Sequence, residues 1–274
     1  MNWNQFGYIC RVNSSKTLST EQKDELSTQS HLNMYANSGS HSKLAHNLVT
    51  QIASQDEATS QKQAVYYQCL PELVNEFKFE HKGWLSYLTI VFVIYVLSSL
   101  LYQSFVVPTF VEIYSKHTIS LNHVFDDYFT YWYVPIILLV LLLSVIFTVI
   151  LKLKNVSALT ELKPFSGLFK FLIPRQLINE YNSLITTLLF PSNHKKGVKA
   201  STPQTQHLAQ CELLGLETQE EFKVLLKQQL KLLNTHIKSF ISKLVIVYGL
   251  VIVVSICLFV KAAYQPLFML GEVL

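Results

Sequence analysis

Long apolar runs alternate with polar segments along the chain, and three of these runs are long enough to cross a membrane. The first, Leu85–Val107, has 23 residues and no charge. As a helix it would extend roughly 35 Å, more than the roughly 30 Å of a bilayer's hydrocarbon core. The second, Tyr128–Leu151, is also uncharged, and the third, Leu244–Val260, has 17 residues. The pattern predicts an all-α membrane protein with transmembrane helices at residues 84–107, 131–151 and 244–260.

Outside these runs, apolar residues recur with helical periodicity. We therefore expect two small helical bundles, in residues 1–83 and 152–243. In the first, Leu44, Leu48 and Ile52 lie four residues apart and share one face of a helix. Such a face must pack on other helices of the same bundle to be stable.

The first bundle begins with a polar segment that allows two interpretations. Residues 1–31 fit either a short strand or a loose arm, and we prefer the arm. A turn is expected at residues 37–40, where Asn, Ser and Gly follow one another. A second helix is expected at residues 60–69, with Ala64 and Val65 on its inward face.

The second bundle contains the most amphipathic helix predicted in the chain, Arg175–Phe190. Its leucines, isoleucines and tyrosine fall on one face, and amide and hydroxyl side chains lie opposite. The Pro, Gly, Ser and Thr content of residues 191–207 predicts a linker. The next helix is expected to begin at Thr218, with Glu221 at the spacing of a capping box.

Two predicted helices continue from a bundle into a span without interruption, Pro71–Val107 and Thr218–Val260. The phrases Val-Pro-Thr-Phe at 107–110 and Gln-Pro-Leu-Phe at 265–268 follow the first and third spans. They form a weak internal repeat at a separation of 158 residues. A loop at residues 108–130 and a tail at 261–274 complete the predicted organisation.

Lysine and arginine are concentrated in one segment, and this sets the expected orientation. Residues 152–243 carry 13 Lys and Arg against six acids, residues 1–83 carry seven against eight, and residues 108–133 carry one against three. Basic residues favour the cytoplasmic side of a membrane. We expect both bundles and the amino terminus in the cytoplasm, and the loop and the carboxyl terminus outside. The amino terminus lacks the apolar core of a signal peptide, so the chain is expected to insert by its own spans.

A basic stripe, Lys223, Lys227 and Lys231, repeats every four residues on the last long helix. It fits a solvated face, the interpretation we prefer, or a contact with lipid headgroups or an acidic partner. The net charge of +4 comes almost wholly from the second bundle. Basic and aromatic residues do not interleave as they do in RNA-binding proteins, so no nucleic-acid partner is expected.

Motifs that carry catalytic chemistry are missing from the sequence. It has no Walker-type glycine loop, no HExxH and no GxSxG. The three predicted spans contain no Asp, Glu, Lys, Arg or His, which ion-coupled transporters usually need within the bilayer. We therefore expect no enzyme activity and no cofactor.

Metal sites are also not expected. The four cysteines are scattered and fit free thiols rather than a disulfide or a zinc site. Two acids at 126–127 lie near His117 and His123, but we prefer a solvated loop to a metal site there. The densest histidine set, at positions 31, 41 and 46, matches no ligand spacing.

The two proline phrases carry a resemblance to a known family. Residues 105–114 read FVVPTFVEIY and residues 264–271 read YQPLFMLG. Both resemble phrases at the span exits of the inner-membrane platform proteins of type II secretion systems and type IV pili, the GspF/PilC family. That family has two related cytoplasmic helical domains, each leading into a span, and both are shorter here. The positions that match the family's motifs are Val107, Pro108, Phe110, Glu112, Gly215, Glu217, Tyr264, Pro266, Phe268 and Gly271.

The resemblance implies a non-catalytic platform protein of the bacterial inner membrane. Such proteins couple a cytoplasmic assembly ATPase to the extraction of pilin or pseudopilin from the membrane, as a homo-oligomer and together with other inner-membrane assembly subunits. The lipid bilayer is an implied partner as well. An alternative from another class also fits the residues: an accessory membrane subunit of a transporter, or a three-span membrane sensor.

Overall fold

The structure, a computed structural model, describes residues 1–36, 41–77, 83–116, 130–165, 167, 169–193 and 202–273. Within these ranges the chain is helical or irregular and contains no strand. Three helical stretches are long and apolar enough to cross a membrane: Leu85–Lys116, Tyr133–Ser157 and Thr218–Phe268. The predicted all-helical character and the three helices of spanning length are thus confirmed for the described residues.

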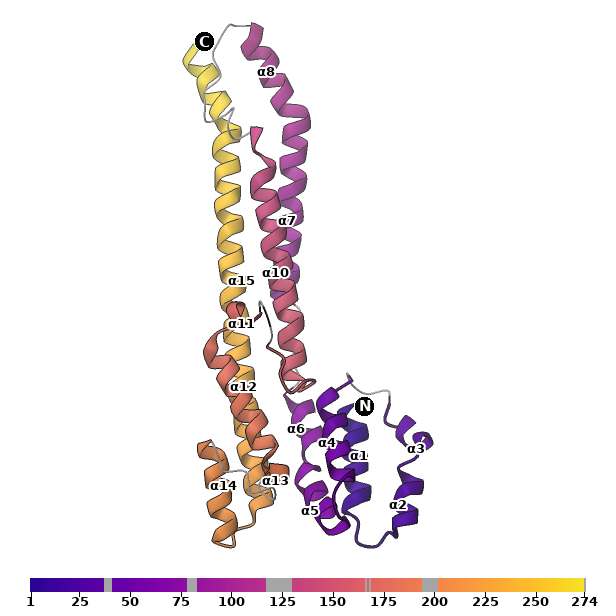
Figure 1. The fold of residues 1–274 in the computed structure, drawn as a ribbon. Coiled ribbons are helices and arrows are strands. Elements are labelled where there is room, and N and C mark those ends of the chain that lie inside the picture. The colour runs from indigo at the N-terminus through magenta and orange to yellow at the C-terminus, as the bar shows by residue number, and fades with distance from the viewer. Residues whose placement is uncertain are drawn as a thin grey trace. The chain divides into compact units, whose positions relative to one another are not determined.

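The chain forms two compact units. Unit 1 comprises Met1–Phe79 and Val149–Ser239, and unit 2 comprises Glu80–Thr148 and Phe240–Leu274. The helices of unit 1 are α1 (Trp3–Ser14), α2 (Thr20–Leu26), α3 (Gln29–Asn33), α4 (Lys43–Ala53), α5 (Glu57–Tyr67), α6 (Leu70–Glu76), α11 (Phe169–Leu172), α12 (Arg175–Leu188), α13 (Phe190–Asn193) and α14 (Pro203–Leu213) (Figure 1). The last turns of α10 (Tyr133–Ser157) and the first part of α15 (Thr218–Val273) also belong to unit 1.

Helix α1 occupies the place of the predicted loose arm, so that prediction is wrong. The Asn2 side chain accepts a hydrogen bond from the Gln5 N–H at 2.8 Å, and the Gln5 side chain accepts one from the Asn2 N–H at 3.0 Å. This capping box starts the helix. Trp3, Phe6 and Cys10 follow at helical spacing and are buried. The amino terminus is helical because it has both a cap and an apolar face.

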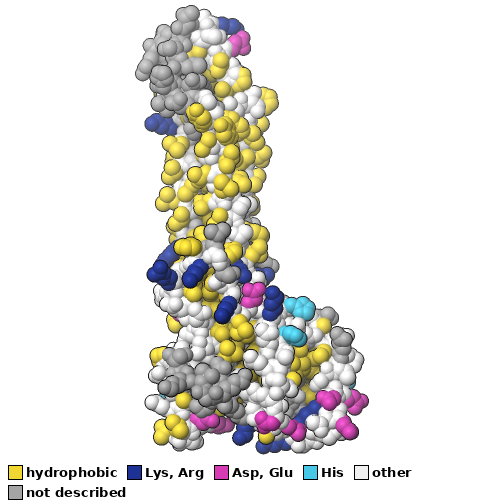
Figure 2. Space-filling model, in the orientation of Figure 1, with side chains coloured by type: hydrophobic (Ala, Val, Ile, Leu, Met, Phe, Trp, Pro, Cys, Tyr) yellow, Lys and Arg dark blue, Asp and Glu magenta, His cyan; other side chains and the backbone are white. Residues whose placement is uncertain are grey.

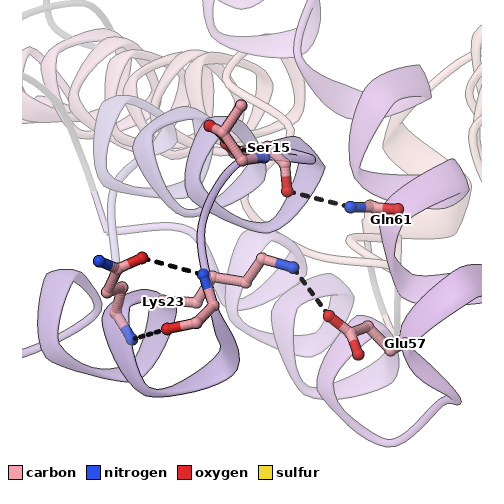
Figure 3. Close-up of polar contacts among 7 residues, drawn as sticks. Ser15, Lys23, Glu57 and Gln61 are labelled. Atoms are coloured by element: carbon pink, nitrogen blue, oxygen red, sulfur yellow. Dashed lines mark hydrogen bonds and ion pairs between the residues drawn. The ribbon is translucent and has the colours of Figure 1, made fainter.

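Polar contacts also attach α2 to α5, as Figure 3 shows. Lys23 Nζ lies 3.0 Å from Glu57 Oε1, and Gln61 Nε2 donates to the Ser15 carbonyl at 3.0 Å. Glu57 is exposed, so the ion pair contributes at most about 1 kcal/mol. The contacts nevertheless fix residues 15–26 to the bundle, which the prediction of a loose arm did not foresee.

The amino-terminal helices bind the backbone that follows α10, more than a hundred residues away in sequence. Ser42 Oγ donates to the Leu159 carbonyl at 2.8 Å, and the Leu44 N–H donates to the Thr160 carbonyl at 3.1 Å. Leu159 has a φ of 49°, the left-handed conformation that often ends a helix and usually falls to Gly. Its side chain is fully buried, so packing holds this residue in a strained conformation.

Several predicted helices are present with shifted ends. Helix α4 buries the predicted stripe of Leu44, Leu48 and Ile52. Helix α5 begins three residues earlier than the predicted helix at 60–69. Helix α12 has the bounds predicted from its amphipathic pattern to within two residues, and it buries that apolar face. Periodicity therefore identified these helices, and at α4 and α5 the side chains of Ser42 and Asp56 cap the first turn.

The predicted continuous helix Pro71–Val107 is wrong, because α6 ends at Glu76. The carbonyl of Phe77 accepts hydrogen bonds from Ser157 Oγ at 3.2 Å and from Asn234 Nδ2 at 3.1 Å. A helix that continued would use its carbonyls within its own next turn. Here side chains from α10 and α15 satisfy the carbonyl instead, and the helix stops.

The predicted linker at 191–207 is also too long. Helix α13 extends to Asn193, and α14 begins at Pro203 with Thr202 as its cap. Thr202 Oγ1 accepts from the Thr205 N–H at 3.3 Å, and a proline is favourable in the first turn. Residues 194–201, like the predicted turn at 37–40, lie outside the described residues.

Buried tyrosine and cysteine side chains complete the core of unit 1. Tyr67 donates its hydroxyl to the Leu188 carbonyl at 3.1 Å, and Tyr181 donates to the Glu161 carbonyl. Burial raises the pKa of both hydroxyls. Burial also raises the pKa of the Cys69 thiol to about 11. These groups are therefore neutral near pH 7, and the core contains no tyrosinate or thiolate charge there.

Unit 2 consists of α7 (Gly83–Leu101), the π-helical turn η1 (Tyr102–Val106), α8 (Val107–Lys116), most of α10 and the second part of α15. Many of its large apolar side chains are exposed, and Figure 2 shows hydrophobic side chains covering these helices. A water-soluble protein rarely exposes so large an apolar surface. Such a surface is stable in hydrocarbon, which agrees with the spanning length of the helices.

The helices of unit 2 extend beyond the predicted spans. The first continues through α8 to Lys116, into the predicted loop 108–130, and α15 continues to Val273, through most of the predicted tail. The remainder of the loop, residues 117–129, lies outside the described residues. Pro108 and Pro266, which were expected to follow the first and third spans, lie inside these helices.

Candidate functional site

The two proline phrases lie within helices of unit 2 rather than after them. Helices α7, η1 and α8 follow one another directly, and Pro108 is the second residue of α8. Pro266 lies within α15. A proline inside a helix cannot donate to the carbonyl four residues earlier, and its ring crowds that carbonyl. Each phrase therefore requires a local adjustment.

Around Pro108 the adjustment is the π-helical turn. In η1 the helix is wider by one residue, and the Val107 N–H donates to the Tyr102 carbonyl. Thr109 Oγ1 donates to the Phe105 carbonyl at 3.0 Å. The helix thus continues past the proline with a hydroxyl of its own satisfying a carbonyl of the preceding turn.

Near Pro266 the neighbouring helix contributes two hydrogen bonds. The Tyr102 hydroxyl donates to the Ala263 carbonyl at 2.8 Å, and the Tyr114 hydroxyl donates to the Pro266 carbonyl at 2.9 Å. Tyr114 is fully buried. The carbonyl four residues before Pro266 belongs to Ala262, so these two bonds do not replace the one that the proline removes. They join α15 to the helix beside it, where the bilayer core offers no water to backbone carbonyls.

One hydrogen-bonded position is common to both phrases. Phe105 and Ala263 each stand three residues before a proline, and each carbonyl accepts a side-chain hydroxyl. The donor comes from the same helix in the first phrase and from the neighbouring helix in the second. The Thr109 bond is the usual bond of a helical threonine to the carbonyl four residues earlier, as also at Thr89 and Thr235, so only the bond at Ala263 joins two helices.

Apolar packing surrounds these hydrogen bonds. Ala262 is buried against Tyr102, Val107 and Phe110, and its small side chain lets the helices approach closely. The Tyr102 ring meets the Phe259 ring edge-on, with centroids 5.5 Å apart. We use the name proline-exit contact for the set Tyr102, Val107, Phe110, Tyr114, Ala262, Ala263 and Pro266.

The structure brings three of the motif positions together. Val107, Phe110 and Pro266 belong to the proline-exit contact. The side chains of four other positions are exposed, and Gly271 lies in the last turns of α15. The four exposed positions are Pro108, Glu217, Tyr264 and Phe268. Glu112, also exposed, pairs with Lys116 one turn later at 2.7 Å.

Sequence reasoning did not identify Tyr102, Tyr114, Ala262 or Ala263. The sequence does contain one signal for the tyrosines: a tyrosine inside an apolar span needs a hydrogen-bond partner for its hydroxyl. A pair of alanines shortly before a proline is likewise a site of close helix approach. Neither signal identifies the partner, since the acceptors are backbone carbonyls.

Gly215, the other glycine among the motif positions, ends α14. Its φ is 78°, and the Leu216 N–H donates to the Cys211 carbonyl at 2.9 Å, the pattern of a Schellman cap. This turn exposes two leucines, Leu213 and Leu214, each 86% accessible. We call residues 213–216 the leucine turn.

The three lysines of the basic stripe have different surroundings. Lys227 Nζ lies 2.9 Å from Glu76 Oε1, so it helps to hold α6 against α15. Lys223 is half-buried, and its charge acts against the burial that raises the pKa of Cys69. Lys231 is exposed. The stripe is therefore partly used in the packing of unit 1.

One group of side chains places a cysteine beside a histidine. Cys211 Sγ lies 3.5 Å from His207 Nε2, and Glu221 Oε1 lies 3.0 Å from the same nitrogen. A catalytic relay needs the carboxylate on the other ring nitrogen, so this geometry cannot pass a proton from thiol to carboxylate. No group of three or more potential metal ligands forms among the described residues, while His117, His123 and the acids at 126–127 lie outside them.

Comparison with known proteins gives no match: no protein-family model matches the chain, and neither a curated protein nor a solved structure is significantly similar to it.

Proposed function

We propose that this protein is an inner-membrane platform subunit for the assembly of a pilus or pseudopilus. In this function it couples a cytoplasmic ATPase to the extraction of pilin subunits from the bilayer. The chain itself performs no catalysis, and it works as a homo-oligomer with other membrane subunits of the machine. The proposal starts from the resemblance of residues 105–114 and 264–271 to the phrases of platform proteins.

The observation that carries the proposal is the proline-exit contact. The two phrases chosen for their resemblance are far apart in sequence, yet Tyr114 donates to the carbonyl of Pro266. The first and third of three spans end on the same side of a membrane, so packing of these two helices brings the phrases together. A duplicated plan with two span exits, as in platform proteins, agrees with this contact.

The long helix α15 supplies a means of coupling. It has 56 residues and, at about 1.5 Å per residue, a length of about 84 Å. In unit 1, Lys227 and His236 of α15 bind Glu76 and Glu180 of shorter helices. A displacement of those helices would be passed along α15. Because α6 ends at Glu76, the first of the two predicted continuous helices is not present, so the proposal assigns coupling to α15 alone.

The leucine turn is the surface we assign to the ATPase. Leu213 and Leu214 are apolar and almost fully exposed, and unit 1 is the part of the chain expected in the cytoplasm. Lys231 of α15 is exposed, and of the three lysines in the basic stripe it is the one we assign to contact with an acidic partner. An apolar turn of this kind fits a groove on a partner protein.

In-cell photocrosslinking combined with gene deletion tests the proposal. Benzoylphenylalanine replaces Leu214 in the full-length protein, and a matched variant carries it at Met34, the residue that follows α3 in the same unit and is 78% exposed. We expect position 214 to capture an assembly ATPase and position 34 not to capture it. Deletion of the gene should abolish pilus assembly or pseudopilus-dependent secretion, and the full-length gene should restore it.

Two results would contradict the proposal. The first is a deletion strain that assembles every pilus and secretes normally. The second is capture of a transport subunit at position 214, which would favour the accessory subunit of a transporter. A ligand-dependent change in signalling with normal pili would favour the membrane sensor instead.

A further inference from the structure

The short helix α11 presents apolar side chains to the outside of unit 1. Phe171 is 91% exposed and Leu172 is 44% exposed, whereas the next residue, Ile173, is buried. Ile173 thus anchors the segment while its two neighbours point away. Helix α12, with Pro174 as its N-cap, follows α11 in the chain. Both helices are labelled in Figure 1. An aromatic ring with this exposure makes little contact with unit 1 itself.

The charges around α11 all have one sign. Between Glu161 and Glu180 the chain carries Lys163, Lys170 and Arg175 and no acid. Lys170 and Arg175 flank the exposed pair, and both are exposed. Exposed apolar groups beside basic groups are the pattern of a segment that lies at the surface of an anionic membrane.

One end of this segment is tied to a residue expected at headgroup level. Lys152 is the first charged residue after the uncharged run Tyr128–Leu151 of α10. Its Nζ lies 3.4 Å from Glu161 Oε2. A lysine at the end of a span lies at the membrane–water boundary. The chain that leads into α11 therefore starts at that boundary.

The direction of α12 within unit 1 bears on the other end of the segment. The Glu180 carboxylate lies 2.6 Å from His236 Nδ1, and Ser183 Oγ lies 3.3 Å from Gln229 Nε2. Rising numbers on α12 meet falling numbers on α15, so the two helices are antiparallel. Arg175 is therefore at the end of α12 that lies beside the last residues of α15 within unit 1, and the apolar run Leu244–Val260 follows these residues in sequence.

We infer that α11 is a membrane-surface anchor that recognises anionic phospholipids. Phe171 and Leu172 enter the boundary between headgroups and acyl chains. Lys170 and Arg175 bind the phosphate groups of anionic lipids beside them. The anchor fixes unit 1 to the bilayer at a point other than the spans, and it does not depend on the function proposed above.

Lipid photocrosslinking in nanodiscs tests the anchor. The full-length protein carries benzoylphenylalanine at position 171 and is reconstituted in phosphatidylcholine alone or with added phosphatidylglycerol. Position 105, 70% exposed in η1, is the control within the membrane, and position 214 in the leucine turn is the aqueous control. We expect lipid adducts at 171 and 105 but not at 214, detected by mass spectrometry.

The charge requirement is tested with K170Q and R175Q. Each substitution should lower the adduct yield at 171 roughly fivefold in phosphatidylglycerol-containing discs and leave it unchanged in phosphatidylcholine. Added salt should lower the yield of the unsubstituted protein in the same way, without any change of sequence. A yield at 171 as low as at 214 overturns the inference, as does crosslinking of 171 to a second copy or a yield insensitive to both charge and salt.

Discussion

Units 1 and 2 are both helical, but they place their large apolar side chains in opposite ways. In unit 1, Phe6 and Tyr67 are fully buried, and side chains such as Ser42 bind backbone carbonyls of distant segments. In unit 2, Phe105 and Phe268 are exposed, and the helices meet through a small residue and tyrosine hydroxyls. Burial from water therefore stabilises unit 1, whereas close packing and hydrogen bonds stabilise the helix contacts of unit 2.

The largest expected effect comes from emptying the core of unit 1. Phe6→Ala removes a fully buried ring that touches Trp3 and Tyr67. The free energy of unfolding of unit 1 should fall by about 3–5 kcal/mol, from lost burial and the cavity left behind. Hydrogen exchange of the α1 and α5 amides in detergent-solubilised protein measures the loss.

The matched substitution in unit 2 is Phe268→Ala, which removes an exposed ring. In a bilayer or micelle it should change stability by less than about 0.5 kcal/mol, as substitutions away from packed contacts usually do. Equal losses for Phe6 and Phe268 would break the comparison, since they would place both rings in the same kind of environment.

The second effect depends on the close approach of α1 to α6. A Cβ added to Gly7 would stand 2.4 Å from Pro71 Cγ, and the proline ring cannot move aside. Gly7→Ala should destabilise unit 1 by about 1–3 kcal/mol through overpacking. In an open helix the same change stabilises by about 1 kcal/mol.

Gly83→Ala is the control, because nothing lies within 4 Å of a Cβ at that position of α7. It should be neutral or slightly stabilising in thermal unfolding followed by circular dichroism. A stabilising Gly7→Ala would return α1 to the loose arm predicted from sequence. Trypsin cleavage after the exposed Arg11 gives an independent measure, since it should be slow while α1 is folded and faster in Gly7→Ala.

The third effect concerns the end of α6. Ser157→Ala or Asn234→Ala alone leaves the Phe77 carbonyl one donor and should cost about 1 kcal/mol. The double variant leaves that carbonyl without either donor, and its cost should exceed the sum of the singles, reaching up to about 4 kcal/mol. Hydrogen exchange of the α6 amides reports the difference. Strict additivity would mean that these donors do not hold the end of the helix.

What the sequence predicted correctly depended on periodicity along a single helix. The stripe of Leu44, Leu48 and Ile52 identified α4, and uncharged length identified the three helices of spanning length. Such patterns need no knowledge of the partner, because any apolar partner will bury them. Helix ends were less predictable, as the start of α1 shows, since its cap is an Asn with Gln rather than Ser or Thr with Glu.

Features that depend on distant backbone could not be predicted. The end of α6 depends on Ser157 and Asn234, which lie 80 and 157 residues away from Phe77. In the candidate site, the phrases around Pro108 and Pro266 were identified, but the contact between them was not. The tyrosines that join them donate to backbone carbonyls. Every residue has such a carbonyl, so the residue types do not show which one is the acceptor.

The smallest expected effect tests the proline-exit contact itself. Tyr102→Phe and Tyr114→Phe keep the rings and remove the hydrogen bonds to Ala263 and Pro266. Each should weaken the contact between the helices by about 0.6 kcal/mol and at most about 1.7 kcal/mol, the range measured for hydrogen bonds between membrane helices. Steric-trap unfolding in bicelles resolves differences of this size, and Tyr264→Phe, at an exposed position of α15, is the control that should have no effect. If all three variants behave alike, the hydroxyls do not join the two phrases, and the proposed platform function loses its main support. If only the first two lose stability, their pilus assembly should decline with the contact, while that of Tyr264→Phe stays normal.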